Sequence, residues 1–271
     1  MSMQKNTPQS GISELLELMT KLRDPDTGCP WDKEQTFSTI SPYTIEEAYE
    51  VADAISNGDM DELEDELGDL LFQVVFYAQI SREDGGFDFN DIATRVSKKM
   101  RQRHPHVFNN QKHEELISWE DEKSNERKAK AQKLGIQPSV IDGVATALPA
   151  LMRAQKLQKR AAREGFDWPN LKPVIAKVQE ELNEVRAEIN SGSSEARLRE
   201  EVGDLIFACV NLARHLGTDA EVAAQEANKK FERRFRAVED NLVKDGKSLR
   251  EAELKELDYY WNAVKQSENK T

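Results

Sequence analysis

One long internal repeat limits the folds that this chain of 271 residues can adopt. The segment DELGDLLFQVVFYA at 65–78 returns as EEVGDLIFACVNLA at 200–213, with Glu, Gly, Asp, Leu, Phe, Val and Ala in register. Upstream of each copy stands an acidic cluster, EEAYE at 46–50 and EELNE at 180–184. Because the same features recur in the same order over half the chain, the repeat predicts two related domains in tandem.

The pattern within each half is helical. The chain is 38% hydrophobic and 32% charged with only 13 Gly and 9 Pro, which is typical of amphipathic helices. No stretch alternates convincingly between apolar and polar residues, so we expect few strands. The sequence therefore predicts an all-α protein of two tandem helical-bundle domains. Helices are expected at 15–22, after Pro42, and at 61–80, 89–103, 148–163, 172–190, 195–216 and 219–242.

The boundary between the halves is marked by a change in composition. ERKAKAQKLGIQPSVIDGVATALP passes from a charged helical pattern to a stretch with Gly, Pro and Ser. We therefore expect an N-terminal domain over 1–125, a linker over 126–147 and a C-terminal domain over 148–271.

Charge and cysteine content narrow the class of partner. A net charge of −12 and a pI near 5.0 repel polyanions, so nucleic acid is not expected as a partner. Cys29 and Cys209 lack CxxC spacing, which argues against a zinc site and a disulfide framework. The run LLFQVVFYAQI is too short to span a bilayer, and the N-terminus is polar. A cytoplasmic protein without a membrane anchor is the expectation.

A helical wheel places the acids of the repeat beside an apolar face. Glu201 and Asp204 fall on the rim of an apolar arc, and Glu66 and Asp69 take the same place in the first copy. The arc of the second copy consists of Val202, Leu205, Ile206, Cys209, Leu212, Ala213 and Leu216.

The acidic clusters upstream follow the same geometry. Glu181 and Glu184 border the apolar face of their helix, as do Glu47 and Glu50 in the first half, whereas Glu180 faces solvent. If the arcs of neighbouring helices pack together, two carboxylates from each helix meet at one edge of the interface.

Carboxylates brought together in this way need a positive charge among them. An all-oxygen set suits Mg²⁺, with Mn²⁺ as a substitute, and no histidine follows a glutamate at the Glu-x-x-His spacing of di-iron bundles. Gly68 and Gly203 lie inside these helices, where glycine costs about 1 kcal/mol relative to Ala, so we expect a close neighbour or ligand there. The predicted metal ligands are Glu181, Glu184, Glu201 and Asp204, with a second candidate site formed by Glu47, Glu50, Glu66 and Asp69. An acidic surface exposed to solvent is the alternative.

The combination of EExxE with a later ExxD resembles the signature of the MazG family of all-α nucleoside triphosphate pyrophosphohydrolases. The likeness extends to GCPWDKEQT, RQRHPHVF, LPALMRAQKLQKRA, GFDW and NKKFERRFR, and so covers almost the whole chain. It implies Mg²⁺-dependent hydrolysis of (deoxy)nucleoside triphosphates, ATP included, at the α–β bond to the monophosphate and pyrophosphate. It further implies broad base specificity, a house-cleaning role in the nucleotide pool, helical domains that form a homodimer, and an active C-terminal domain.

The resemblance also implies roles for individual residues. Lys230, Arg233 and Arg234 share a helix face and can bind phosphates, while Trp261 matches a residue that contacts the base; an ordinary basic surface and simple helix docking are the alternatives. The expected catalytic residues are Glu180, Glu181 and Glu184. The expected nucleotide-binding residues are Lys177, Glu180, Glu181, Glu200, Asp204, Lys230, Arg233, Arg234 and Trp261.

The first half departs from this pattern at one cation. Lys99 and Arg103 match Lys230 and Arg234, but Gln102 replaces Arg233. This favours a role of the N-terminal domain in dimerisation or regulation. Two other functions remain open from sequence: a base-selective dUTP or dCTP pyrophosphatase, and a non-catalytic helical scaffold that senses nucleotides.

Overall fold

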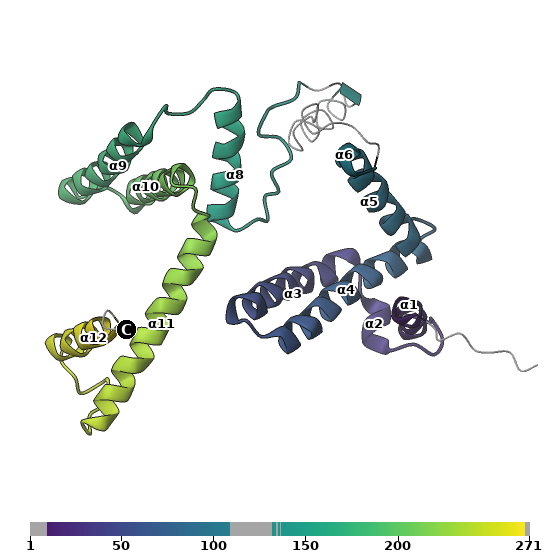
Figure 1. Cartoon of the computed structure of the whole chain (residues 1–271), viewed down its shortest axis with the longest axis horizontal. Helices are drawn as coiled ribbons and strands as arrows, with labels where there is room; N and C mark the ends of the chain where they lie inside the picture. The colour runs from purple at the N-terminus through teal and green to yellow at the C-terminus, as the bar shows by residue number, and fades with distance from the viewer. Residues whose placement is uncertain (1–9, 109–131, 134, 136, 269–271) are drawn as a thin grey trace, which may run out of the picture. The chain divides into compact units, whose positions relative to one another are not determined.

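The computed structural model describes residues 10–108, 132–133, 135 and 137–268. The chain divides into two compact units, residues 1–122 and 123–271. The described parts of both are helical and contain no strand, so the predicted all-α class is confirmed (Figure 1). The first unit contains α1 (Gly11–Leu22), α2 (Pro30–Glu34), α3 (Phe37–Asn57), α4 (Met60–Glu83), α5 (Phe89–Arg103) and α6 (Pro105–Phe108). The second contains α8 (Ala150–Arg163), α9 (Leu171–Ser191), α10 (Glu195–His215), α11 (Ala220–Lys244) and α12 (Leu254–Glu268).

Each unit is built around an antiparallel helical hairpin, α3 with α4 and α9 with α10 (Figure 1). Gly58 and Gly192 end the first helix of each hairpin in the left-handed conformation, at φ 71° and 69°. This conformation favours glycine and turns the chain sharply. Asp59 and Ser194 then accept backbone hydrogen bonds as N-caps of the second helices. The short turns bring the two acidic clusters of each half face to face.

The expected start of the helix after Pro42 is wrong, and three of the described helices lie outside the predicted ranges. Helix α3 begins at Phe37 instead of after Pro42, because Thr36 and Thr39 form a capping box that starts the helix upstream of the proline. Pro42 therefore lies inside the helix, where it removes one backbone hydrogen bond. The short helix α2 begins at Pro30, within the stretch expected to be a loop, α6 follows the predicted helix at 89–103, and α12 follows the last predicted helix. Residues 126–131, 134 and 136 of the expected linker lie outside the described residues.

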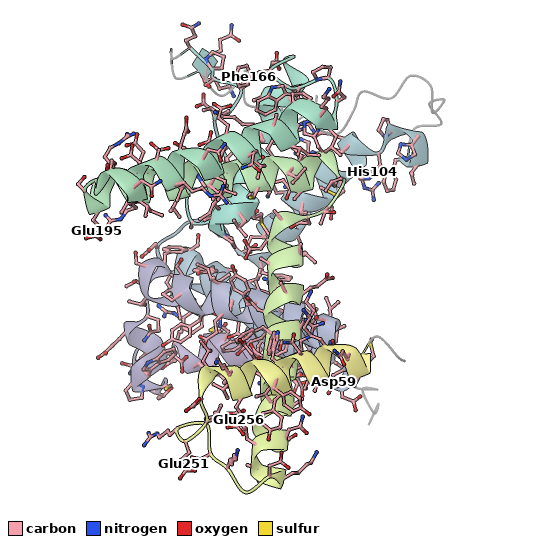
Figure 2. All side chains as sticks on the ribbon, turned by 90° about the vertical axis from the view of Figure 1, so that its left-hand side faces the viewer. Asp59, His104, Phe166, Glu195, Glu251 and Glu256 are labelled. Carbon is pink, nitrogen blue, oxygen red and sulfur yellow. The ribbon has the colours of Figure 1, made fainter. Side chains whose placement is uncertain are left out.

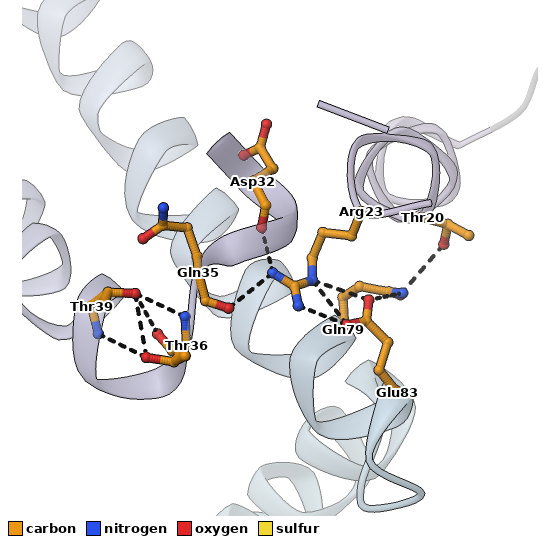
Figure 3. Close-up of polar contacts among 8 residues, drawn as sticks. All are labelled: Thr20, Arg23, Asp32, Gln35, Thr36, Thr39, Gln79 and Glu83. Atoms are coloured by element: carbon orange, nitrogen blue, oxygen red, sulfur yellow. Dashed lines mark hydrogen bonds and ion pairs between the residues drawn. The ribbon is translucent and has the colours of Figure 1, made fainter. Parts of the chain in front are cut away.

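One arginine fastens the loop region of the first unit to α4 (Figure 3). The Arg23 guanidinium donates to the carbonyl oxygens of Asp32 and Gln35 at 2.5 and 3.1 Å and to the Glu83 carboxylate at 2.7 Å. It also lies 5.3 Å from the centre of the Phe76 ring. Because Phe76 belongs to the buried core with Met19, Ile40, Val75 and Ile80, this contact ties the loop to the centre of the unit.

In the second unit, a buried glutamine fixes the start of α11 against α8. The Gln155 side chain donates to the Thr218 carbonyl at 3.0 Å and accepts from the Ala220 amide at 2.9 Å. At its other end α11 packs against α12, with Val238, Leu242, Tyr260 and Val264 as the buried apolar side chains. Each end of α11 is therefore held by a different helix.

The loop that precedes α9 is fastened to the end of α10 by an ionic network. Arg214 donates to both carboxylate oxygens of Asp167, and the His215 Nε2 lies 2.9 Å from one of them. Hydrogen bonds from Arg214, together with the His215 contact, lower the pKa of Asp167 to about 2 although burial acts in the opposite direction. Phe166, next in the chain, is 85% exposed (Figure 2). Among the described helices none is long and apolar enough to cross a membrane.

Candidate active site

Three carboxylates meet in the hairpin of the second unit. Glu181 of α9 and Glu201 and Asp204 of α10 each offer one oxygen atom, and these atoms all lie within 4.8 Å of one another. Glu181 and Glu201 are only 4% and 7% exposed, whereas Asp204 is exposed. We call these three residues the C-terminal cage. Two deeply placed acids and one open to solvent give a centre that an incoming ligand can reach from one side.

Glu184, the fourth predicted ligand, lies at the edge of the C-terminal cage. Desolvation raises its pKa, and the nearby carboxylates of Glu181 and Glu201 raise it further. The side chain is exposed and is not among the three whose oxygen atoms lie mutually within 4.8 Å. The Glu184 carboxylate therefore lies close enough to the cage for the negative charges of Glu181 and Glu201 to raise its pKa.

Lys177 neutralises one side of the C-terminal cage. Its ammonium group lies 2.7 Å from a Glu181 oxygen and 2.8 Å from a Glu180 oxygen. Hydrogen bonds to these two carboxylates raise the pKa of Lys177. Glu180 is exposed, as predicted, and contacts the cage through this lysine.

Arg197 neutralises the other side and was missed by the sequence analysis. Its guanidinium contacts Glu201 at 2.7 Å, Glu200 at 2.6 Å and, across the hairpin, Glu188 at 3.2 Å. The signal in the sequence was its position one helical turn before Glu201 on the same face. Removing a partner from a buried carboxylate is costly, so Arg197 and Lys177 keep the two buried acids of the cage stable in the absence of a cation.

The first unit contains a matching cluster, the N-terminal cage of Glu47, Glu66 and Asp69. Gln73 donates to Glu47 at 3.3 Å. Desolvation raises the pKa of Glu47 and of Glu66, and neighbouring carboxylates, Glu50 among them, raise both further. The N-terminal cage therefore has the same arrangement of carboxylates, and these carboxylates repel one another.

The two cages differ in their counter-charges. In the repeat, Lys177 aligns with Tyr43 and Arg197 aligns with Glu62. The positions that neutralise the C-terminal cage thus carry a neutral and a negative residue in the first half. Ion pairs therefore neutralise the C-terminal cage at two positions where the first half offers no cation.

The structure corrects the expected orientation of the helices of the C-terminal cage. Glu201 was placed on the rim of an apolar arc, but it lies in the buried seam together with Ala208 and Asn211. Val202 and Ile206 of the arc are instead 42% and 48% exposed. The apolar arc of α10 therefore faces largely outward in the single chain, and the carboxylates lie between the helices.

The expectation of a close neighbour at the two helix glycines is also wrong within this chain. A Cβ atom added at Gly68 or Gly203 meets no described atom within 4 Å. Both residues lie on open helix surface, so no packing within the chain requires glycine there.

The predicted phosphate-binding cations lie apart from the C-terminal cage. Arg233 and Arg234 of α11 bind Glu268 of α12 at 2.8 and 2.7 Å, and Lys230 is exposed. In Figure 1, α12 lies beside the part of α11 that is remote from α8 and α10. Trp261 packs against Phe231, with ring centres 5.5 Å apart. The single chain thus presents the cage and the cation group as two separate features.

The donor set of each cage suits a hard divalent cation. Carboxylate oxygens are the ligands that Mg²⁺ and Mn²⁺ prefer, and no described histidine or cysteine joins either group. The fold and site therefore define a class: an all-helical protein with a duplicated helical hairpin, each copy carrying a carboxylate centre for a divalent cation.

Comparison with known proteins specifies the family. The model of the MazG nucleotide pyrophosphohydrolase domain matches residues 35–108 and 170–238, one match for each hairpin. The chain is 54% identical over 262 residues to the nucleoside triphosphate pyrophosphohydrolase of Escherichia coli (strain K12), covering 95% of this chain and 98% of that protein. It is 41% identical over 261 residues to the nucleoside triphosphate pyrophosphohydrolase/pyrophosphatase MazG of Thermotoga maritima, covering 95% and 97%. The chain belongs to the MazG family.

Proposed function

We propose that this chain hydrolyses (deoxy)nucleoside triphosphates at the α–β bond in a Mg²⁺-dependent reaction that releases the nucleoside monophosphate and pyrophosphate. The observation that carries the proposal is the C-terminal cage, in which two buried carboxylates are held ready by Lys177 and Arg197. The names of the full-length relatives support the reaction. Broad base specificity and a cytoplasmic house-cleaning role are part of the proposal.

The carboxylates of the proposed centre have different roles. Glu181, Glu184, Glu201 and Asp204 would hold the cation, which when bound supplies charge neutralisation for the triphosphate and lowers the pKa of a coordinated water. Glu180 is exposed beside Lys177 and is suited to orient a water molecule from outside the cage. The raised pKa of Glu184 makes its carboxylate a stronger proton acceptor than an ordinary glutamate.

The cations of α11 would bind the phosphates and Trp261 the base. Arg233 and Arg234 present planar guanidinium groups, which bind phosphate oxygens in pairs. Lys177 and Lys230 add single charges, and Glu200 is held beside the cage by Arg197. Since the cation group and the cage are separate in one chain, a second copy is needed to bring them together in this proposal.

A homodimer is therefore part of the proposed function. The hairpin of α9 and α10 exposes Ile175 by 51%, Ile189 by 61%, Val202 by 42% and Ile206 by 48%. A second copy packed against this hairpin would remove these apolar side chains from water. Light scattering coupled to size exclusion would measure the mass; a monomer would contradict this part of the proposal.

The N-terminal domain is proposed to bind a cation weakly and to serve dimerisation or regulation. Its cage lacks the counter-charges that Lys177 and Arg197 provide, and Gln102 stands where Arg233 stands in the second half. We retain 1–125, 126–147 and 148–271 as the proposed N-terminal domain, linker and C-terminal domain.

A matched pair of variants tests the proposal. Glu184→Gln removes a proposed ligand of the C-terminal cage, and Glu50→Gln makes the same change at the equivalent position of the first half. With Mg²⁺ and each common ribo- or deoxyribonucleoside triphosphate, products are separated by anion-exchange chromatography. We expect monophosphate and pyrophosphate from the wild type and from Glu50→Gln, and a loss of at least about 100-fold in Glu184→Gln or in chelator.

Each alternative has its own result in this assay. Diphosphate and orthophosphate as products would refute cleavage at the α–β bond. Turnover confined to dUTP or dCTP would identify a base-selective enzyme. Binding of triphosphates without any turnover would identify a nucleotide sensor. Full activity of Glu184→Gln would refute the assignment of catalysis to the second unit.

A further inference from the structure

One carboxylate holds both arginines that are assigned to phosphate binding. The Glu268 oxygen Oε1 accepts from Nε and Nη2 of Arg233 at 3.2 and 2.8 Å. The oxygen Oε2 accepts from Nε and Nη2 of Arg234 at 2.8 and 2.7 Å. The carboxylate thus bridges two guanidinium groups, each through the edge that arginine uses to bind a phosphate.

The position of Glu268 follows from the docking of α12 on α11. Tyr260 and Val264 bury one face of α12 in the core of this helix pair, and the next turn carries Glu268 to the arginines. The Glu268 carboxylate is 27% exposed, and Arg234 is 19% exposed, so the contact is partly shielded from water. Hydrogen bonds from Arg234 and Arg233 lower the pKa of Glu268 to about 2, so the group is charged at neutral pH.

The same contact orders the proposed base-binding residue. The Arg234 guanidinium lies 5.9 Å from the centre of the Trp261 ring, and Trp261 lies two helical turns before Glu268 on the same face of α12. Glu268 therefore fixes the orientation of Arg234 over the indole. An anion that displaces Glu268 from Arg234 therefore changes the environment of the Trp261 ring.

We propose that Glu268 is an internal competitor for the phosphates of the substrate: it occupies the phosphate-binding edges of Arg233 and Arg234, and a triphosphate must displace it. The inference rests on the proposed function, which assigns these arginines to phosphate binding. Glu268 sets the affinity for the triphosphate, because part of the binding free energy is spent on breaking its contacts. A carboxylate with one negative charge holds the arginines less strongly than a polyphosphate does, so the exchange favours the substrate at high concentration.

The test measures binding of inorganic triphosphate to the full chain by calorimetry in the presence of chelator. The chelator removes divalent cations, so the arginines are probed without the cages. Glu268→Gln keeps the size of the side chain and removes its charge. An exposed ion pair contributes about 0.2–1 kcal/mol, so the loss of two such contacts predicts a Kd about twofold to thirtyfold lower than that of the wild type.

Glu256→Gln is the matched control. Glu256 lies near the start of the same helix (Figure 2), has the same 27% side-chain exposure and forms an ion pair with Lys247. The variant therefore removes one charge and one ion pair from α12 without touching the arginines. Its Kd for inorganic triphosphate is expected to equal that of the wild type, and circular dichroism verifies that both variants are folded.

The outcomes separate this inference from the proposed function. A lower Kd in Glu268→Gln alone, with a lower KM for ATP in turnover and no gain in kcat, supports internal competition. An unchanged or higher Kd overturns it, since Glu268 would then be irrelevant or would position the arginines for binding. If Arg234→Gln leaves binding unaffected in both backgrounds, the phosphates are held elsewhere, and the assignment of the arginines fails together with this inference.

Discussion

Arg197→Gln removes the counter-charge from Glu201, one of the two buried carboxylates of the C-terminal cage. The Glu201 side chain is 9% exposed and Arg197 is 49% exposed, at a separation of 2.7 Å. A hydrogen bond between charged groups contributes about 1.5–3 kcal/mol, and solvent at the exposed arginine reduces this to about 1–2 kcal/mol. For a unit of this size, each kcal/mol changes the Tm by about 2–4 °C, so we expect the Tm to fall by roughly 2–8 °C in chelator.

Magnesium should reduce this loss. Without Arg197, the carboxylates of Glu201, Glu181 and Asp204 repel one another, and a bound cation replaces the missing positive charge. The arginine also competes with the cation for Glu201, so the variant is expected to bind Mg²⁺ more tightly and to gain more stability from it. Thermal unfolding by calorimetry, in chelator and in saturating Mg²⁺, measures both effects.

Arg199→Gln serves as the control for this prediction. Arg199 pairs only with Glu195 among the ion pairs of the described chain, near the start of α10 (Figure 2), and the two side chains are 77% and 87% exposed. Its removal is expected to change the free energy of unfolding by less than about 0.5 kcal/mol. A loss in Arg197→Gln that is the same with and without Mg²⁺, or an equal loss in Arg199→Gln, would refute the reasoning.

Two further predictions concern the stability of the second unit. Asp167→Asn should cost about 2 kcal/mol at pH 7, because Arg214 lowers the pKa of Asp167 from 3.8 to about 2. A carboxylate whose pKa is lower in the folded state stabilises the fold at any pH above its pKa in the unfolded chain, and this contribution is lost as the pH falls through the folded-state pKa. The difference in unfolding free energy between wild type and variant should therefore shrink to about half near pH 3. A difference that does not depend on pH would contradict this prediction. Gly203→Ala should raise the stability of the monomeric chain by up to about 1 kcal/mol, since the added methyl group meets no described atom within 4 Å. A fall in Tm would instead show that a second copy packs closely against this glycine.

The helical periodicity and the repeat were enough to predict the fold class and the position of most helices. Both are local properties of the sequence: apolar residues recur at helical spacing, and the paired acids recur in each half. The predicted helix start is wrong where a capping box sets it: Thr36 is the N-cap of α3, and the helix therefore begins before Pro42. The wheel does not include the hydrogen bonds that begin a helix.

The pairing of acids from neighbouring helices was predicted, but their depth was not. The wheel assumed that the most apolar face of α10 packs against α9, whereas the seam runs through Glu201 and leaves Val202 exposed. Arg197 and Lys177 make this packing tolerable, since each lies one turn from a buried acid. Such compensation depends on three-dimensional contacts, as does the pairing of Arg234 with Glu268, for which no periodic pattern gives a signal.

The C-terminal cage and the arginines of α11 with Glu268 are both proposed to act in substrate binding, but the residues of the cage come earlier in the chain. All carboxylates of the C-terminal cage belong to one hairpin, closed by the turn at Gly192, and hairpins with local contacts form early in folding. The arginines lie on α11, and their partner Glu268 lies at the end of the last helix. As the protein emerges from the ribosome, the hairpin of α9 and α10 is therefore complete before the C-terminal helix pair exists. The order of synthesis therefore completes the C-terminal cage first, and a nascent chain that has not yet received α12 would hold its arginines without an internal carboxylate.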